Sequence, residues 1–144
     1  MKHWFLDTNV LIDFLTNRQP FAAAATDLLG LAYVGRVRLY VASLSFSTAF
    51  YLLKRSLAAT SRQTASQLAQ HKLAQLKPLL TIVAVDDEVV TKALAAGFAD
   101  YEDALQYFAA ASVPAIELLI TRNAKDFKQS KLPLADPVQA LQLA

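Results

Sequence analysis

A short apolar run that stops abruptly at a carboxylate constrains this chain most. Trp4–Leu6 has the composition of a buried β-strand, Asp7 follows it directly, and apolar residues at helical spacing begin at once in 10–15. Asn9 is expected to be the N-cap of that helix. This order places Asp7 at the carboxyl end of a strand, the edge of an open α/β sheet where ligands bind. The alternative is that Asp7 is only a second turn-forming residue beside Asn9.

Composition narrows the class of protein. The chain has 144 residues, 55% of them hydrophobic and 18% charged, so we expect one domain over 1–144 with a substantial core. The net charge of +2 permits a nucleic-acid partner without requiring one. There is no cysteine, which excludes a disulfide framework and a thiolate nucleophile. His3 and His71 lie far apart in the sequence, which argues against histidine-based catalysis.

No segment has the length expected of a membrane anchor. The apolar run at the N-terminus is too short for a signal peptide. The longest uncharged run, 39–53, falls short of the roughly 20 residues that cross a bilayer. We therefore expect a cytoplasmic protein that does not contact membrane.

Strands and helices are expected to alternate along the chain. After residues 4–6, further buried strands are expected at 39–41, 80–85 and 118–121. Helical segments with Ser, Asp or Pro at their starts lie between them, at 21–34, in the apolar stretch that follows Ser43, Ser45 or Ser47, and at 61–77, 87–96 and 101–111, with a last helix after Asp136. This order predicts an α/β fold, a mostly parallel sheet of four to five strands flanked by helices on both faces.

Acidic residues then gather at one edge of the predicted sheet. Right-handed crossovers bring the carboxyl ends of parallel strands to the same rim. Asp7 ends the first strand, while Asn123 and Asp126 follow the strand that ends at Thr121. Asp100, Glu102 and Asp103 lie at a helix start, where Asp100 and Glu102 are also explained as a cap and a first-turn acid. An oxygen-rich site of this kind suits Mg²⁺ or Mn²⁺.

Three segments together resemble a PIN domain. They are 7–13 (DTNVLID), 102–106 (EDALQ) and 120–127 (ITRNAKDF), and the likeness covers essentially the whole chain. It is closest to the single-domain PIN proteins that act as VapC-type toxins of toxin–antitoxin pairs. The resemblance implies a metal-dependent endoribonuclease that uses an activated water, with Mg²⁺ or Mn²⁺ as cofactor and RNA as substrate.

The resemblance also assigns roles to individual residues. Asp7 would be the first metal ligand, and Asp103 matches the third acid of the family. Asn123 matches the position after the last core strand, and Asp126 contributes to the fourth corner. The catalytic set is thus Asp7, Asp103 and Asp126, with Asn123 as a further ligand. The residues expected to support this set are Thr8, Asn9, Thr48, Asp100 and Thr121.

One position departs from the family pattern. The second acid is usually a Glu about five residues before a Leu-basic-basic ending, which here is Leu53-Lys54-Arg55. The corresponding residue is Thr48, and no acid occurs between Asp27 and Asp86. Thr48 offers a neutral oxygen but no charge, so metal binding is expected to be weaker or the chemistry lost. Alternatively Thr48 only packs within an apolar helix.

Two other functions are weighed beside the nuclease. One is a PIN-fold module that has lost cleavage and binds RNA or a protein partner. The other is a different α/β phosphate enzyme, which the sequence disfavours because Asp7-Thr8-Asn9 lacks a second acid and no glycine-rich phosphate loop exists.

Basic residues beside the rim suggest where a substrate would bind. Arg122, Lys125 and Lys128 are expected to hold the RNA backbone, or else to form an ordinary solvated face. The apolar helices around 46–57 and 61–77 are candidates for a groove that receives an antitoxin helix. A homodimer is also expected.

Overall fold

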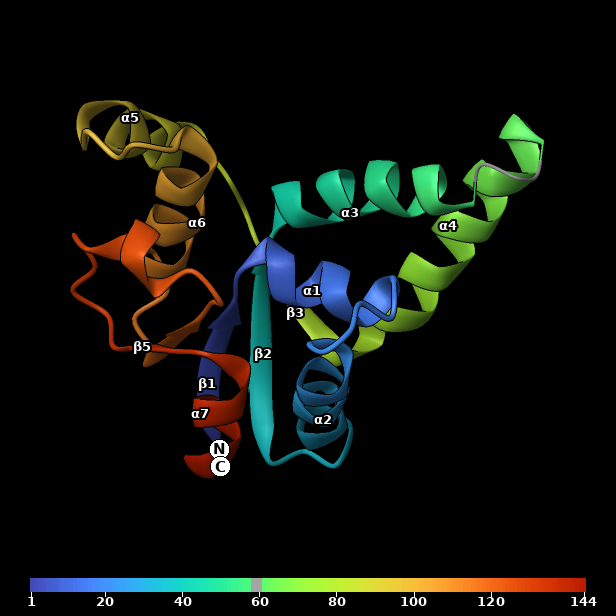
Figure 1. Cartoon of the computed structure of the whole chain (residues 1–144). Coiled ribbons are helices and arrows are strands. Elements are labelled where there is room, and N and C mark those ends of the chain that lie inside the picture. The colour runs from blue at the N-terminus through green and yellow to red at the C-terminus, as the bar shows by residue number, and fades with distance from the viewer. Residues whose placement is uncertain (58–60) are drawn as a thin grey trace.

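A five-stranded parallel sheet forms the centre of the computed structural model, which describes residues 1–57 and 61–144 (Figure 1). The strand order is β3-β2-β1-β4-β5, and every neighbouring pair is parallel. The strands are β1 (Lys2–Leu6), β2 (Val37–Ala42), β3 (Leu80–Val83), β4 (Leu118–Ile120) and β5 (Leu134–Ala135). The predicted α/β class is confirmed. The edge strand β5 was not expected at that place, because two residues carry no periodic signal.

Helices cover both faces of this sheet (Figure 1). One face packs against α1, α2, α3, α4 and α7, and the other against α5 and α6. Their bounds are α1 (Thr8–Leu15), α2 (Ala22–Tyr33), α3 (Ser43–Ser56), α4 (Arg62–Leu76), α5 (Asp87–Ala95), α6 (Tyr101–Ala111) and α7 (Pro137–Gln142). Short 3-10 helices, η1 (Lys77–Leu79) and η2 (Ala124–Phe127), follow α4 and β4. The predicted helices are therefore present, with ends shifted by one or two residues.

Alternation of side chains along β1 divides the core in two. Trp4 and Leu6 point into the cluster under α1–α4, whereas Phe5 points into the cluster under α5 and α6. All three are essentially inaccessible to solvent. Since both faces of the strand are covered, the run is continuously apolar, and the first polar residue, Asp7, marks the point where the strand leaves the core.

The helix starts confirm some predicted caps and correct others. Asp86, Asp100 and Asp136 each accept a hydrogen bond from a first-turn amide, as expected. Asn9 is not the cap of α1: Asp7 holds that position and Asn9 is already helical. None of the serines expected to cap α3 does so, since Ala42 is its N-cap and makes no side-chain cap bond.

A buried ion pair ties the end of β4 to α1. Arg122 donates from Nε and Nη2 to the two carboxylate oxygens of Asp13, at 2.6 and 3.1 Å. The Asp13 side chain is 1% exposed and that of Arg122 is 17% exposed. The guanidinium also lies 4.0 Å from the ring centroid of Phe21, which precedes α2. The pair therefore joins the chain that follows β4 to α1 and to the start of α2.

Within the described part of the chain, no helix is long and apolar enough to span a membrane.

Loss of the buried pair is expected to destabilise the fold. Asp13→Ala leaves the guanidinium of Arg122 largely buried without its carboxylate, which should lower the free energy of unfolding by about 3 kcal/mol. Glu88→Ala is the matched control, because it removes the exposed pair with Lys92 and should cost less than about 1 kcal/mol. Urea titration of both variants measures the difference. Equal midpoints for the two variants would contradict a structural role for Asp13.

Candidate active site at the carboxyl edge of the sheet

Asp7 is fixed at the junction of β1 and β4. Its backbone N–H donates to the Ile120 carbonyl at 2.9 Å, continuing the ladder past the last strand residue. Its side chain is buried, and Oδ2 accepts a hydrogen bond of 2.8 Å from Thr121 Oγ1. Thr121 Oγ1 in turn accepts from the Asn123 amide at 3.0 Å. Two adjacent strand ends therefore orient one carboxylate.

This environment opposes the ionisation of Asp7. Burial raises the pKa of Asp7 from 3.8 to about 6, and the nearby charge of Glu102 adds to that rise. Hydrogen bonds from Thr121 and from the Thr8 backbone, together with the charge of Arg122, oppose it. Hydrogen-bond donors therefore orient the Asp7 carboxyl, but the positive charge near it does not offset the effect of burial on its pKa.

Asp103 lies on the first turn of α6, close to Asp7. Asp100 caps this helix by accepting from the Asp103 amide at 3.0 Å, which fixes the turn that carries Asp103. Burial raises the pKa of Asp103 to about 7, with further contributions from the charges of Asp7, Asp100, Asp126 and Glu102, in that order. The predicted placement of the α6 start at the same rim as Asp7 is therefore what the structure has. Asp126, exposed in η2, lies near enough for its charge to oppose ionisation of Asp103.

Glu102, which the sequence explained as a first-turn acid, is a further acid of the cluster. Burial, and then the charge of Asp100, raises the pKa of Glu102, and the charge of Glu102 in turn raises that of Asp7. The acids at this rim thus come from the junction of β1 and α1, from the start of α6 and from η2. Like charges held this close favour a bound cation, which would neutralise them.

A buried polar junction lies directly behind Asp7. Thr8 Oγ1 lies 2.7 Å from Ser45 Oγ of α3 and accepts a 2.6 Å hydrogen bond from Gln106 Nε2 of α6. Gln106 Nε2 also lies 3.2 Å from Ser45 Oγ. All three side chains are buried. Sequence reasoning missed Ser45 and Gln106, because only the fold brings residues 37 and 98 positions away to Thr8.

Thr48, at the expected position of the missing acid, makes no side-chain hydrogen bond within the described part of the chain. It is half-buried, one turn after Ser45 on α3. Ser45 is the α3 residue whose side chain lies within hydrogen-bond distance of Thr8 among the described residues. The expected supporting role of Thr48 stays a prediction, as does that of Asn9, whose buried Oδ1 has no partner among the described residues.

The three basic residues expected to hold RNA differ in their surroundings. The guanidinium of Arg122 is bound by Asp13 and packs over Phe21, so it already has a structural partner. Lys125 and Lys128 are exposed and form no ion pair within the described residues. Both lysines line a pocket with Asp103 and Asp126. The structure therefore leaves two free cations beside the acids.

The residues present fit a hard divalent ion. Among the described residues no three His, Cys, Asp or Glu side chains form a ready-made metal cage. Mg²⁺ does not require one, because it keeps several waters and commonly binds through one or two carboxylates together with a substrate phosphate. Asp7 and Asp103 supply such carboxylates, with Asn123 and Asp126 nearby. A bound cation would lower the raised pKa values of Asp7 and Asp103.

A family model described as PIN domain matches residues 3–125 of the chain. The chain belongs to the PIN domain family. The match includes every acid of the cluster except Asp126, which lies one residue beyond its end. No curated protein sequence matches the chain.

Solved structures share the PIN fold at low sequence identity. VapBC2 from Rickettsia felis, bound to a promoter DNA fragment, has a TM-score of 0.62 at 20% identity, over 93% of this chain and 98% of that one. A toxin–antitoxin complex from Klebsiella pneumoniae has a TM-score of 0.61 at 21% identity, over 92% and 96%. VapC20 from Mycobacterium tuberculosis, a toxin that cleaves the sarcin-ricin loop, has a TM-score of 0.57 at 13% identity, over 81% of this chain and 86% of that one. These likenesses establish the fold.

The raised carboxyl pKa values predict how stability depends on pH without metal. Between about pH 4 and pH 7 the unfolded chain loses the Asp103 proton while the folded protein keeps it, so the free energy of unfolding should fall as pH rises. Asp103→Asn should remove part of this slope and stabilise the protein at pH 8 by about 1 kcal/mol, allowing for solvent screening of a half-buried group. Urea midpoints at pH 5 and pH 8 measure both effects. A slope that is the same in both proteins would contradict the assignment.

Proposed function

We propose that this protein is a metal-dependent endoribonuclease and the toxin of a toxin–antitoxin pair. The observation that carries the proposal is the placement of Asp7 and Asp103 together at the carboxyl edge of the sheet, both with raised pKa values. Membership of the PIN domain family supports it. So does the fold shared with VapC20, a toxin that cleaves the sarcin-ricin loop.

Each residue of the cluster has a distinct task in this proposal. Asp7 and Asp103 hold Mg²⁺ or Mn²⁺, which when bound lowers the pKa of a water and neutralises charge on a phosphodiester. Thr121 and the Thr8 amide orient Asp7. Asn123 and Asp126 would help to orient that ion or its water. Lys125 and Lys128 contact the RNA backbone, since phosphate contacts position a substrate without reading its bases.

The missing acid at Thr48 favours the alternative of a PIN-fold module without cleavage. Two features of the site oppose that alternative. Glu102 adds a negative charge close to Asp7, whereas the neutral side chain of Thr48 adds none. The junction of Ser45, Thr8 and Gln106 holds α3 and α6 against the Asp7 segment without a carboxylate on α3. We therefore retain the nuclease as the leading function.

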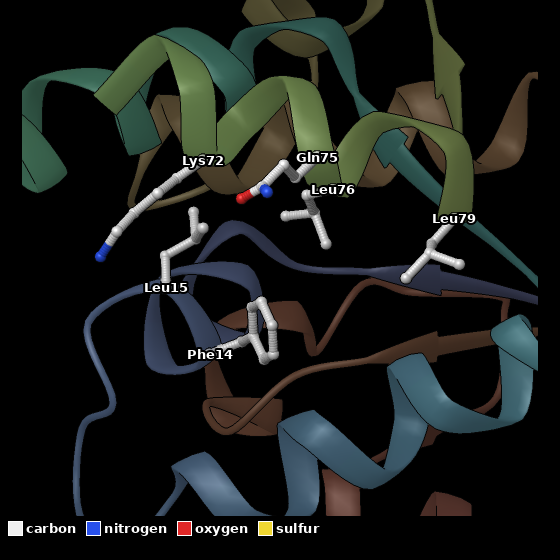
Figure 2. Close-up of a pocket in the computed structure, with 6 residues that line it drawn as sticks. All are labelled: Phe14, Leu15, Lys72, Gln75, Leu76 and Leu79. Carbon is white, nitrogen blue, oxygen red and sulfur yellow. The ribbon is translucent and has the colours of Figure 1, made fainter. Parts of the chain in front are cut away.

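An apolar groove between α1 and α4 is the surface we assign to the antitoxin (Figure 2). It has a volume of about 320 Å³ and is lined by Phe14, Leu15, Leu76 and Leu79, with Lys72 at its edge. The Klebsiella pneumoniae structure is a toxin–antitoxin complex, which supports a partner of that kind. The groove differs from the one expected between α3 and α4, because Phe46 and Phe50 of α3 pack onto the core. Homodimerisation stays a prediction.

Cleavage assays test the proposed activity. The purified protein, freed of any partner, should cleave RNA in Mn²⁺ or Mg²⁺ and not in EDTA. Asp7→Asn should lower the rate by about 100-fold or more, because it removes a ligand charge at the centre of the cluster. Urea titration shows that the variant is folded. Equal cleavage by wild type and Asp7→Asn, or cleavage in EDTA, would refute the proposed site.

A second substitution in the same assay separates the enzyme from the binding module. Thr48→Glu should raise the rate of a weak enzyme by about tenfold, since it adds a carboxylate where the family has one. Thr48→Gln has similar size without charge and is the matched control. If neither wild type nor Thr48→Glu cleaves any RNA while both fold and bind it, the binding module becomes the better description.

Association with the cognate antitoxin tests the groove. Phe14→Glu places a carboxylate in its apolar lining and should weaken the complex by about 100-fold. Tyr33→Glu is the control, because Tyr33 is 80% exposed on α2 and lies outside the groove. Calorimetric titration of each variant with the antitoxin gives the affinities. Unchanged binding of Phe14→Glu would exclude this groove as the interface.

A further inference from the structure

A pocket beside the acid cluster contains an aromatic residue that the proposed chemistry does not use. The pocket has a volume of about 370 Å³, which is within the range of small-molecule sites. Asp103 of α6 lines it, as do Lys125 and Asp126 of η2 and Lys128 directly after η2. Phe98, from the connection between α5 and α6, lines it as well. One cavity therefore offers acids, cations and an aromatic ring.

The ring of Phe98 is held in place by its neighbours. It stacks on Tyr107 of α6, with ring centroids 5.8 Å apart and an interplanar angle of 28°. Tyr107 is itself buried, and its hydroxyl accepts a hydrogen bond of 3.1 Å from the Lys131 amide. Gly97, with a φ of +73°, makes the turn that ends α5 immediately before Phe98. Phe98 is half-buried, so part of it remains accessible in the pocket.

The charges of the pocket fit a nucleotide rather than a neutral ligand. Lys125 and Lys128 are exposed and form no ion pair with any described acid, so both are available to phosphate oxygens. Asp103 and Asp126 would repel a phosphate in the absence of a cation, and attract one through a bound cation. The pocket therefore offers a phosphodiester two lysines and a place for a cation beside the acids, and it offers the attached base the ring of Phe98.

We propose that this pocket binds one unpaired nucleotide of the RNA, next to the scissile phosphate, with its base packed against Phe98. The proposal rests on the proposed nuclease function and adds the form of substrate. A base packs against an aromatic side chain only when it is free of its helical stack. The site therefore selects single-stranded segments or loops over continuous duplex.

Fluorescence of a substituted base tests the contact directly. A short oligouridylate with 2-aminopurine at its centre and a phosphorothioate backbone, which resists cleavage, is titrated with protein in Mg²⁺, so that binding is measured with the cation present. Stacking on Phe98 should quench the fluorescence. Phe98→Leu retains an apolar contact with Tyr107 but lacks the ring, and should abolish the quench and weaken binding about tenfold. Tyr51→Leu is the control, an aromatic residue 61% exposed on α3, and should behave as wild type.

Two further measurements test the contact of Lys128 with phosphate and the preference for single-stranded RNA over duplex. Lys128→Gln should weaken binding and reduce its salt dependence while leaving the quench at saturation unchanged. Wild type should bind the same oligonucleotide in a duplex more weakly, with no effect of Phe98→Leu on that affinity. Full quenching by Phe98→Leu, or equal affinity for the single strand and the duplex, would overturn the proposal. Urea titration of Phe98→Leu, and of Phe98→Met as a second variant, establishes that the proteins compared are folded.

The failure of this proposal and the failure of the nuclease are distinguishable. Cleavage in Mn²⁺ without Phe98-dependent quenching would retain the enzyme and reject the pocket. Phe98-dependent quenching without cleavage would retain the pocket as a single-strand binding site and reject the enzyme.

Discussion

The burial of carboxylates at one edge of the sheet, added to their mutual repulsion, is the constraint on which the rest of this molecule depends. Asp7 is buried where β1 ends, and Asp103 stands beside it on α6. Both pKa values lie well above 3.8, so the folded protein holds these groups at a cost in free energy near neutral pH. Such a cost is typical of functional sites, where the geometry that the chemistry needs opposes stability.

The surrounding structure is arranged to hold that geometry. Thr121 at the end of β4 orients the Asp7 carboxylate, and the junction of Thr8, Ser45 and Gln106 joins α1, α3 and α6 behind it. The buried pair of Arg122 and Asp13 fixes the chain directly after Thr121. These contacts act through neutral donors or through charges that are already paired. They therefore position Asp7 and leave its charge to be neutralised by something else.

Local sequence was sufficient to predict strands β1 to β4 and to place Asp7 directly after the first of them. The apolar run 4–6 stops at Asp7, and the run 118–121 precedes Asn123. Each is a strand followed by a polar residue, a pattern that depends only on neighbours in the sequence and is kept in the fold. Asp100 was correctly expected as a cap for the same reason. The position of the α1 cap was wrong, because Asp7 and Asn9 are both good capping residues and sequence alone does not choose between them.

What sequence could not predict are the contacts between distant segments. Gln106 reaches Thr8 across 98 positions and Arg122 reaches Asp13 across 109, and neither pair shares a motif. Arg122 was expected to hold RNA because it lies beside the rim, but proximity in sequence gave no sign that Asp13 already binds its guanidinium. Phe98 likewise follows a helix end without any pattern, and only the fold places it beside Asp103.

Calorimetry of Mn²⁺ binding tests most directly whether this edge of the sheet is a metal site. The account predicts that wild type binds Mn²⁺ and that binding at about pH 6.5 releases protons, seen as heats that vary with the buffer, because Asp7 and Asp103 are partly protonated there. At about pH 8.5 the release should disappear, and Asp103→Asn should bind at least tenfold more weakly. Absence of binding by folded wild type, or equal binding by Asp103→Asn, would contradict the account.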